Sequence, residues 1–445
     1  MASESEIGAT AAPAIDHHET TENSTSKARA LTLIAAFLGW MFDGLEMGIF
    51  PLVARPALNE MHHNAFLAGH LTGAGASGAP SEAYVQFWMG IVTAAFLFGA
   101  AGGGLIFGWL GDRIGRVRAL TASILCYSIF TGLCYFAQEP WHLGALRFIA
   151  ALGMGGEWSL GVALVMEIWP AKFRPLMAGI IGAAANFGFV LVSIIAWIWP
   201  VTPDNWRWLL LLGAAPALLT FVLRIFVPES EVWKRAVQGK KVRPLREVFS
   251  PPLLSRTLLA TAFAAIPLIV TWGIVQWIAL WTDQMAGPAH PEYKGISNAA
   301  VAGAAILGSL AAPLLGQKIG RRPAYFILCL CAVASAGWLF GTIRTFGPAF
   351  LAGVSLVGFF ATSFYGWLPL YLPELFPTRV RATAQGVAFN AGRILAAIGA
   401  WNMGSIMGLF DNSYPRAGLA ISMVYLLGMI LIWFAPETKN RPLPE

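Results

Sequence analysis

The feature that most constrains this chain is a series of long apolar runs separated by short polar turns. Hydrophobic residues make up 57% of the 445 residues and charged residues only 12%, whereas a soluble domain carries about a quarter charged residues. A run of about 20 apolar residues is what an α-helix needs to cross the hydrocarbon core of a bilayer. We therefore predict an all-α membrane protein with twelve transmembrane helices that contact the lipid bilayer.

The predicted spans form two sets of six. The first set comprises residues 30–54, 87–110, 118–137, 142–168, 176–199 and 207–227. The second comprises residues 255–285, 298–316, 323–343, 347–372, 383–409 and 417–435. We accordingly divide the chain into a disordered cytoplasmic tail at 1–27, an N-terminal bundle at 28–228, a cytoplasmic linker at 229–253, a C-terminal bundle at 254–436 and a cytoplasmic tail at 437–445.

Three short motifs occur twice, in the same order, at offsets of 205 to 208 residues. Glu167, Pro170, Arg174 and Gly179 have the same spacing as their second copies, which are Glu374, Pro377, Arg381 and Gly386. The other two pairs are Asp112–Arg116 with Gln317–Arg321, and Pro228–Ser230 with Pro436–Thr438. Such a repeat indicates a parallel duplication, and so two pseudo-symmetric six-helix bundles.

The distribution of basic residues predicts the orientation. Most of the 29 Lys and Arg residues lie in the tails, the linker and the turns on one side. The opposite side holds Arg55, Arg207, Lys294, Arg344 and Arg416. The positive-inside rule then makes both termini cytoplasmic in a cell (inner) membrane, and residues 55–86 become an external loop.

Composition also limits the partners. The basic residues are scattered in short clusters, which argues against nucleic acid. The four cysteines all fall inside apolar runs and no histidine accompanies them, so we expect buried apolar side chains, no metal and no cofactor. A monomer is expected.

One loop motif and several intramembrane residues resemble a known family. Gly108–Arg118 resembles the loop between the second and third helices of the major facilitator superfamily. Phe42–Glu46 and the stretch from Arg147 through Glu157 to Arg174 resemble its proton symporters for sialate, lactate and aromatic acids. The resemblance covers residues 28–445. It implies the major facilitator fold and alternating access around a site between the bundles.

Two departures from the family patterns and two shared motifs indicate which branch of the superfamily the chain resembles. Pro228–Ser230 and Pro436–Lys439 resemble motifs shared with sugar porters, but only Gln276 stands where those carry a glutamine pair. Gln317 replaces the Asp112 of the first loop motif, so we expect a weaker second gate.

Five ionisable residues lie away from the ends of predicted spans: Asp43, Glu46, Arg147, Glu157 and Arg393. Each costs about 2.5–3.5 kcal/mol at mid-helix, which points to a function. Arg393 lies about 15 Å into its helix, and its counterpart in the repeat is the uncharged Asn186. We predict that Arg393 binds a substrate carboxylate; the alternative is a structural ion pair with Glu157 or Asp43. The predicted substrate-binding residues are Arg393, Asn390, Gln276, Asn186 and Tyr365.

The acidic residues Asp43, Glu46 and Glu157 are the predicted proton carriers, because a carboxyl group in an apolar cavity can load and release a proton near neutral pH. The alternative for Glu157 is a packing role beside Gly153, Gly155 and Gly156. Arg147 is interpreted as structural.

The turns on the cytoplasmic side supply a predicted gate. In the resembled family, acid–base pairs there latch the outward-facing state; the alternative is that these charges only set the topology. The predicted gating residues are Gly108, Asp112, Arg113, Arg116, Glu167, Arg174, Gly320, Arg321, Glu374 and Arg381.

These features predict a secondary active transporter and not an enzyme, since no soluble catalytic domain and no nucleophile–base pair is evident. We predict proton-coupled symport of a small organic anion, a monocarboxylate such as lactate-, sialate- or aromatic-acid-like compounds. A sugar or polyol porter is the alternative, and a drug exporter stays open.

Overall fold

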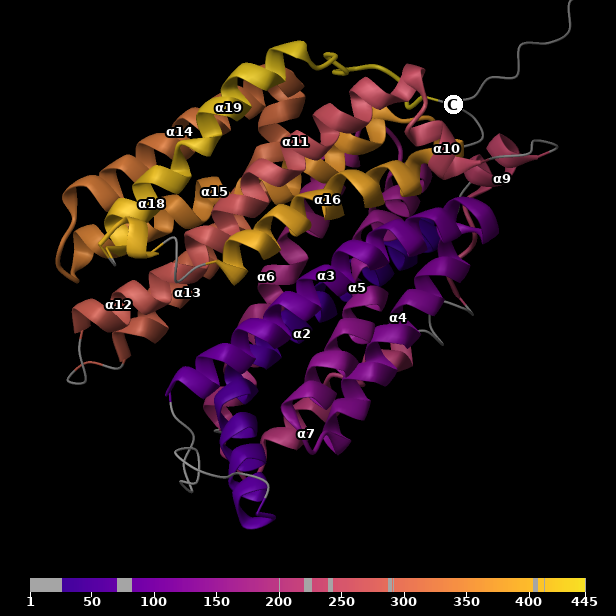
Figure 1. Cartoon of the computed structure of the whole chain (residues 1–445). Coiled ribbons are helices and arrows are strands. Elements are labelled where there is room, and N and C mark those ends of the chain that lie inside the picture. Colours follow the sequence, from indigo (N-terminus) through magenta and orange to yellow (C-terminus); the bar gives the residue numbers. More distant parts are fainter. Residues whose placement is uncertain are drawn as a thin grey trace, which may run out of the picture.

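The structure of the chain, a computed structural model, describes residues 26–69, 82–199, 201–219, 226–238, 243–286, 290, 292–402, 407–411 and 413–444. All regular secondary structure in these ranges is helical. Figure 1 shows two groups of helices lying side by side, one from the first half of the chain and one from the second.

The helices of the first half are α2 (Ser26–Leu67), α3 (Glu82–Ile114), α4 (Arg116–Leu133), α5 (Pro140–Ile168), α6 (Arg174–Ile198) and α7 (Trp206–Leu212). Those of the second half are α11 (Pro251–Gly273), α12 (Ile278–Ala286), α13 (Glu292–Ile319), α14 (Arg321–Thr342), α15 (Pro348–Leu375), α16 (Arg381–Trp401), α18 (Tyr414–Ser422) and α19 (Val424–Leu431). Between the halves lie two short helices, α9 (Glu231–Val237) and α10 (Pro244–Val248).

Ten helices in the described ranges are long and apolar enough to cross a membrane. Two predicted spans are not among them. Residues 220–225 of the span 207–227 lie outside the described residues. The span 383–409 corresponds largely to α16, whose 21 residues are long enough, but Arg381, Gln385, Asn390 and Arg393 make it less apolar than its neighbours.

The first predicted span is longer than the sequence suggests. We expected residues 55–86 to form an external loop, but α2 continues to Leu67. The extension buries Ala57, Leu58 and Met61, and its Glu60 pairs with Arg207. Tertiary packing therefore stabilises helix in a segment that looked like a loop; the part of that loop at 70–81 lies outside the described residues.

The predicted span 255–285 is interrupted. The helix α11 ends at Gly273, and Ile274 has the non-helical angles φ −131° and ψ −54°. A short 3₁₀ turn, Val275–Trp277, then leads into α12. Glycine costs about 1 kcal/mol in a helix interior relative to alanine, so Gly273 is a reasonable place for the break.

The internal repeat extends to individual hydrogen bonds. The Glu229 carboxylate accepts from the backbone N–H groups of Arg116 and Val117, which begin α4. The Glu437 carboxylate accepts in the same way from Arg321 and Arg322, which begin α14. Partial burial alone would raise the pKa of Glu437, but these backbone hydrogen bonds hold that pKa below its usual value.

Two glycines make this arrangement possible. Gly115 precedes α4 with φ +112°, and Gly320 precedes α14 with φ +106°. Both lie in the left-handed region that favours glycine. A Cβ atom would also approach the Glu229 carboxylate at Gly115 and the Glu437 carboxylate at Gly320, to 2.3 and 2.9 Å respectively.

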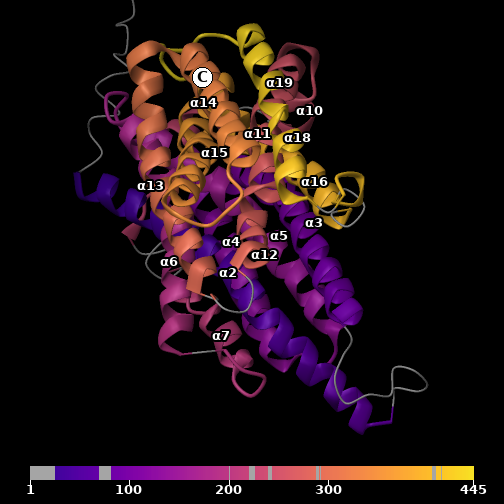
Figure 2. The ribbon, with the colours of Figure 1, turned by 90° about the vertical axis from the view of Figure 1, so that its left-hand side faces the viewer.

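The two halves touch through helix pairs that run close together. The helix α3 packs on α16, and α6 packs on α13 and α15. Small residues allow this, because a Cβ atom on Gly386 would lie 2.2 Å from the Gly104 carbonyl oxygen, and one on Gly182 would lie 2.4 Å from the Tyr365 carbonyl oxygen. Figure 2 shows α6 reaching the second-half helix α13.

Candidate functional site

A cavity of about 530 Å³ lies between the two halves. Its walls come from α2 and α6 on one side and from α11, α13, α15 and α16 on the other. This volume is within the range of pockets that bind small molecules, about 300–1,000 Å³. The cavity extends toward Ser193 near the end of α6 and Asn298 near the start of α13, so it reaches away from the end where α6 begins.

Arg393 is the one charged side chain among the described residues that line the cavity. It is only 3% exposed. Its Nη1 donates to Asn390 Oδ1 at 2.9 Å, and its guanidinium lies 5.1 Å from the centre of the Phe389 ring. In the described part of the chain Arg393 forms no ion pair, although Asp43 lies within electrostatic range of it.

Asn390 lies behind Arg393 and does not line the cavity. Its side-chain nitrogen donates to the carbonyl oxygens of Gly155, at 3.1 Å, and Gly386, at 2.9 Å. These two bonds orient the amide so that its oxygen points to Arg393. Asn390 thus connects α5 of the first half with α16 of the second.

Of the other predicted substrate residues, Asn186 and Tyr365 line the cavity. The side chain of Gln276 lies outside the described residues. Aromatic side chains form much of the wall: Trp40, Phe189, Trp272, Tyr365 and Phe389. Trp158, Trp277 and Trp367 are buried in packing contacts instead.

The acidic residues Asp43 and Glu157 lie together behind this wall. The Glu157 carboxylate packs against α2, where a Cβ atom on Gly39 would meet it. Asp43 lies within electrostatic range of both Glu157 and Arg393. Both carboxyl groups are buried and lie within hydrogen-bonding reach of each other, and neither forms an ion pair in the described ranges.

Glu46 is placed differently from the other two acids. Its Oε1 accepts from Arg147 Nη1 at 2.9 Å and from Thr131 Oγ1 at 3.0 Å. The Arg147 guanidinium also lies between the rings of Phe50 and Phe96, at 4.8 and 4.7 Å. Arg147 therefore has the packing contacts expected of a structural residue.

A buried cluster of acids and bases joins the halves at the end where α6 and α16 begin. We name the group formed by Asp112, Arg116, Glu167 and Arg381 the latch. Glu167 Oε1 accepts from Arg116 Nη2 at 3.2 Å and from Arg381 Nη1 at 3.0 Å. Arg116 also pairs with Asp112. All four side chains are fully buried.

The latch crosses from one half to the other through three kinds of bond. Arg381 of the second half pairs with Glu167 of the first. Asp112 accepts from the backbone N–H groups of Ala382 and Thr383, at 3.3 and 2.7 Å, at the start of α16. Arg116 donates to the carbonyl oxygen of Thr378 at 2.8 Å. A carboxylate at a helix N-terminus is also favoured by the helix dipole.

Among the described residues, no ion pair of the second copy of the motif crosses between the halves. Arg321 forms a two-point ion pair with Glu374 of the same half, at 2.9 and 2.7 Å. Arg174 donates to the Trp169 carbonyl at 3.1 Å, and no hydrogen bond joins it to Glu374. Gln317 accepts from Arg321 at 3.3 Å. The asymmetry follows from Gln317, which stands where the first copy has Asp112. Its uncharged amide cannot bind the start of α6 as the Asp112 carboxylate binds the start of α16.

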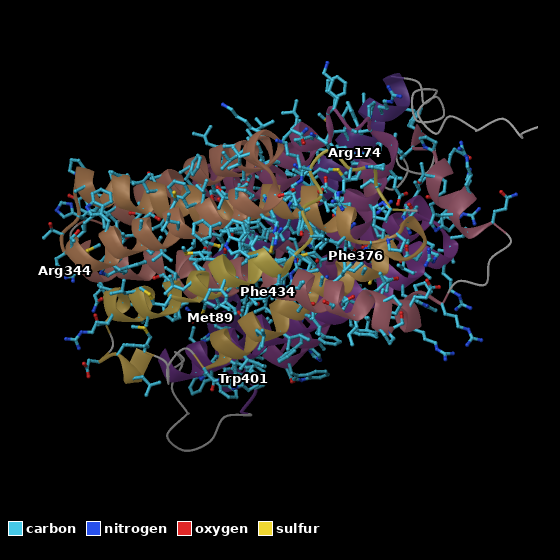
Figure 3. The ribbon with its side chains drawn as sticks, turned by 90° about the horizontal axis from the view of Figure 1, so that it is seen from above. Met89, Arg174, Arg344, Phe376, Trp401 and Phe434 are labelled. Carbon is cyan, nitrogen blue, oxygen red and sulfur yellow. The ribbon has the colours of Figure 1, made fainter. Side chains whose placement is uncertain are left out.

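The remaining predicted gating residues lie around these clusters. Gly108 lets α3 approach α16, since a Cβ atom there would lie 2.8 Å from the Ala382 carbonyl. Arg113 is exposed and stacks over Trp109. Figure 3 shows Arg174 and Phe376 toward one end of the molecule and Arg344 at the other, which separates the latch end from the end that the cavity approaches.

The sequence did not single out several cavity residues. Trp40, Thr271, Asn298 and Phe389 line it together with Arg393. Phe389 lies one helical turn before Arg393, so helix spacing was a usable signal for it. Thr271 and Asn298 are single polar residues in apolar runs and carried no such signal.

Two helical halves that repeat the same motifs, a cavity between them and a cluster of ion pairs across one end are the arrangement of a membrane transporter. The chain belongs to the Major Facilitator Superfamily, whose sequence profile matches residues 32–400. The predicted family and fold class are confirmed, and the protein is an integral membrane transporter, not an enzyme.

Curated relatives extend over most of the chain. A probable 4-methylmuconolactone transporter of Cupriavidus pinatubonensis is 30% identical over 92% of this chain and 91% of its own length. The cis,cis-muconate transport protein of Acinetobacter baylyi is 29% identical, over 79% and 86% respectively. The gentisate transporter of Corynebacterium glutamicum is 25% identical, over 89% and 88%.

Among solved structures, the proton:xylose symporter XylE has a similar fold. It superposes with a TM-score of 0.75 at 18% identity and covers 94% of this chain and 98% of its own.

Proposed function

We propose that this chain is a proton-coupled symporter of a small organic anion, a carboxylate with an unsaturated or aromatic body. The observation that carries the proposal is Arg393, a buried guanidinium on the wall of the inter-half cavity with no ion pair in the described part of the chain. A buried charge is unfavourable unless it is paired. A carboxylate ligand would supply the missing partner, and the planar fork of donors fits it.

The cavity wall supports the unsaturated body. Trp40, Tyr365, Trp272 and Phe389 present ring surfaces beside Arg393, and ring faces pack well on flat conjugated molecules. The names of two relatives refer to muconate, an unsaturated acid, and to gentisate, an aromatic acid. Acids of these two types would fit a cavity with aromatic walls. We favour a single carboxylate per bound molecule because one charged group lines the described wall.

Asp43 and Glu157 are the proposed proton carriers. Both are buried, and their carboxyl groups lie within hydrogen-bonding reach of each other. Two carboxylates that share a buried site repel each other, so a proton on one of them is favoured. Asp43 also interacts electrostatically with Arg393. Binding of an anion at Arg393 would weaken the hold of Arg393 on Asp43, which links anion and proton in one step.

The latch gives the proposed gate. With the latch closed, the cavity reaches toward the opposite end, which the distribution of Lys and Arg makes the outer side. Loosening the latch while the halves rock would open the cavity toward the cytoplasmic side. We place the chain in the cell (inner) membrane, with both termini in the cytoplasm.

A sugar or polyol porter remains the second candidate. Its support is the neutral polar set on the cavity wall, Asn186, Ser193, Asn298 and Thr362, which could bind hydroxyl groups. That site would not require the charge of Arg393, and this difference separates the two candidates.

The test uses purified protein in proteoliposomes with an imposed pH gradient. Uptake is measured for gentisate, benzoate, nicotinate, cis,cis-muconate, lactate and xylose, with substrate-driven alkalinisation recorded in parallel. We expect uptake of at least one unsaturated acid, and loss of it in Arg393→Ala. The control, Arg416→Ala, alters an exposed arginine and should transport as the wild type does. Uptake of xylose alone, or normal acid uptake by Arg393→Ala, would contradict the proposal.

A further inference from the structure

A line of contacts joins α5 of the first half to α16 of the second (Figure 1), and we name it the seam. At one end of the seam, Glu167 of the latch pairs with Arg381 at 3.0 Å. About two turns earlier on α5 and one turn later on α16, a Cβ atom on Gly386 would lie 3.4 Å from Ser159 Oγ. The two helices are therefore antiparallel here, and the seam runs from the latch toward the part of α16 that carries Arg393.

The end of the seam nearest the cavity contains an aromatic stack. The rings of Trp158 on α5 and Phe389 on α16 have their centres 4.0 Å apart and their planes 15° apart. Phe389 also lines the cavity, and the Arg393 guanidinium lies 5.1 Å from the centre of its ring. The Phe389 ring therefore contacts both Trp158 of the first half and the arginine of the anion site.

A hydrogen bond accompanies this stack. The side-chain nitrogen of Asn390 donates to the Gly155 carbonyl oxygen of α5 at 3.1 Å, and Asn390 Oδ1 accepts from Arg393 at 2.9 Å. Phe389 and Asn390, which both contact Arg393, are thus each held by α5. The position of the guanidinium depends on contacts that cross between the halves.

These contacts cannot survive the opening of the latch end. The seam closes that end, so a path from the cavity to it requires α5 and α16 to separate. Asn390 would keep its bond to the Gly386 carbonyl within α16 but would lose the bond to Gly155. Phe389 would lose Trp158. Arg393 would then be oriented less firmly than it is with the latch closed.

We propose that Trp158 is a positioning residue that makes the affinity of the anion site depend on the state of the latch. Through Phe389 it holds Arg393 in place only while the latch is closed, so the acid binds more tightly from the outer side than from the inner side. The inference rests on the proposed function and adds a residue and a direction of affinity to it. A ligand that binds one state better stabilises that state, so the loss of affinity on opening favours release into the cytoplasm.

The test compares the two faces of the protein in membrane vesicles. Half-saturation concentrations are measured by counterflow of labelled acid, without a pH gradient, in right-side-out and inside-out vesicles with saturating unlabelled acid inside. The probe is the acid that the uptake panel selects from gentisate, benzoate, nicotinate and cis,cis-muconate. Trp158→Leu removes the ring, and Trp158→Phe keeps an aromatic face.

The matched control is Trp367→Leu. Trp367 is also fully buried, but it packs on Phe263, Tyr325 and Tyr371 of its own half. Its loss should lower stability and leave both half-saturation concentrations unchanged.

In the wild type we expect the half-saturation concentration to be at least about tenfold lower in right-side-out vesicles, the effect of a lost hydrogen bond to a charged group. Trp158→Leu should raise the outer value by about threefold to tenfold, the range expected for the loss of one aromatic pair. The inner value should stay within about twofold of the wild type, because the stack is already broken in that state. Trp158→Phe should restore most of the outer affinity.

The outcomes distinguish this inference from the proposed function. Equal or reversed affinities on the two sides of the wild type would overturn the inference and leave acid transport standing, and this comparison needs no variant to fold. An unchanged outer value in Trp158→Leu, or an equal rise on both sides, would also overturn it. If no acid of the panel is transported, the proposed function fails and the inference fails with it.

Discussion

A guanidinium inside a membrane protein keeps its charge at low cost only where its donors find acceptors. In the described ranges, the protein gives Arg393 one acceptor, Asn390 Oδ1, at 2.9 Å. Asn390 is in turn held by two backbone carbonyls. The pair is thus arranged so that one face of Arg393 is fixed and its other donors are available to a ligand.

We expect Asn390→Ala to weaken binding of the transported acid by roughly tenfold, since a hydrogen bond to a charged group is worth about 1.5–3 kcal/mol. Asn390→Asp should weaken it further, because a carboxylate would pair with Arg393 and compete with the substrate. Isothermal titration in detergent measures both constants.

The control for Asn390 is Asn402→Ala, an exposed asparagine beyond the end of the same helix. It should bind as the wild type does. Equal or tighter binding by Asn390→Asp would show that substrate does not depend on the charge of Arg393.

The residue pattern predicted part of this arrangement. The spacing of Asn390 and Arg393 by three residues placed them on one face of a helix, and the structure has them in contact. The residue pattern could not show how deeply Asn390 is buried, because Asn390 is enclosed by Gly104 of α3 and Gly155 of α5. Contacts between the halves are set by packing over more than 200 residues of sequence and leave no local pattern.

Single elements show the same limit. Twelve apolar runs predicted the helices of both halves, but not the extension of α2 to Leu67 or the break after Gly273. The extension depends on packing against α7, which no local pattern shows. The C-terminal segment is a third case, since it was predicted as a cytoplasmic tail at 437–445 and the sequence did not indicate the contacts that it makes.

That segment instead returns to the latch. The carbonyl oxygen of Pro444 accepts from Arg381 Nη2 at 2.9 Å and from the Thr378 backbone N–H at 3.2 Å. Arg381 therefore bridges the tail and Glu167 of the other half. The tail holds Arg381 in the position that closes the latch.

We expect deletion of residues 441–445 to loosen the latch by about 1–3 kcal/mol, the cost of leaving buried donors without an acceptor. Hydrogen exchange of the Ala382 and Thr383 amides, which Asp112 binds in the closed latch, should become faster. Exchange in the middle of α14 serves as the internal reference.

The matched control deletes Glu445 alone and keeps Pro444. It should protect Ala382 and Thr383 as the full chain does. If the longer deletion leaves these amides equally protected, the tail does not support the latch.

At the scale of the whole molecule, the two halves share one motif but use it differently. In the first half the motif reaches the other half through Glu167 and Asp112. In the second, Arg321 and Glu374 pair within their own half. Among the described residues, one asymmetric cluster of ion pairs joins the halves at the latch end, and we propose that its strength sets the balance between two states of the transporter.

The positions of these residues decide which acid–base pair is informative in a charge-swap experiment. Arg116 and Glu167 both belong to the first half. Exchanging their charges would therefore replace the acid that pairs with Arg381 of the second half by a base. Glu167 and Arg381 are the pair that crosses, 3.0 Å apart and fully buried. Removing one partner of a buried ion pair costs about 3–5 kcal/mol.

We expect Glu167→Arg and Arg381→Glu each to lower proton-driven uptake at least about tenfold, because each leaves like charges in a buried cluster. The double variant Glu167→Arg with Arg381→Glu restores one acid and one base across the halves and should recover part of the rate. Glu374→Gln, which breaks a pair inside one half, should lower the melting temperature more than it lowers uptake. Uptake assays and thermal unfolding on all four proteins decide the matter: a double variant no faster than either single change would mean that the Glu167–Arg381 pair does not carry the closure between the halves.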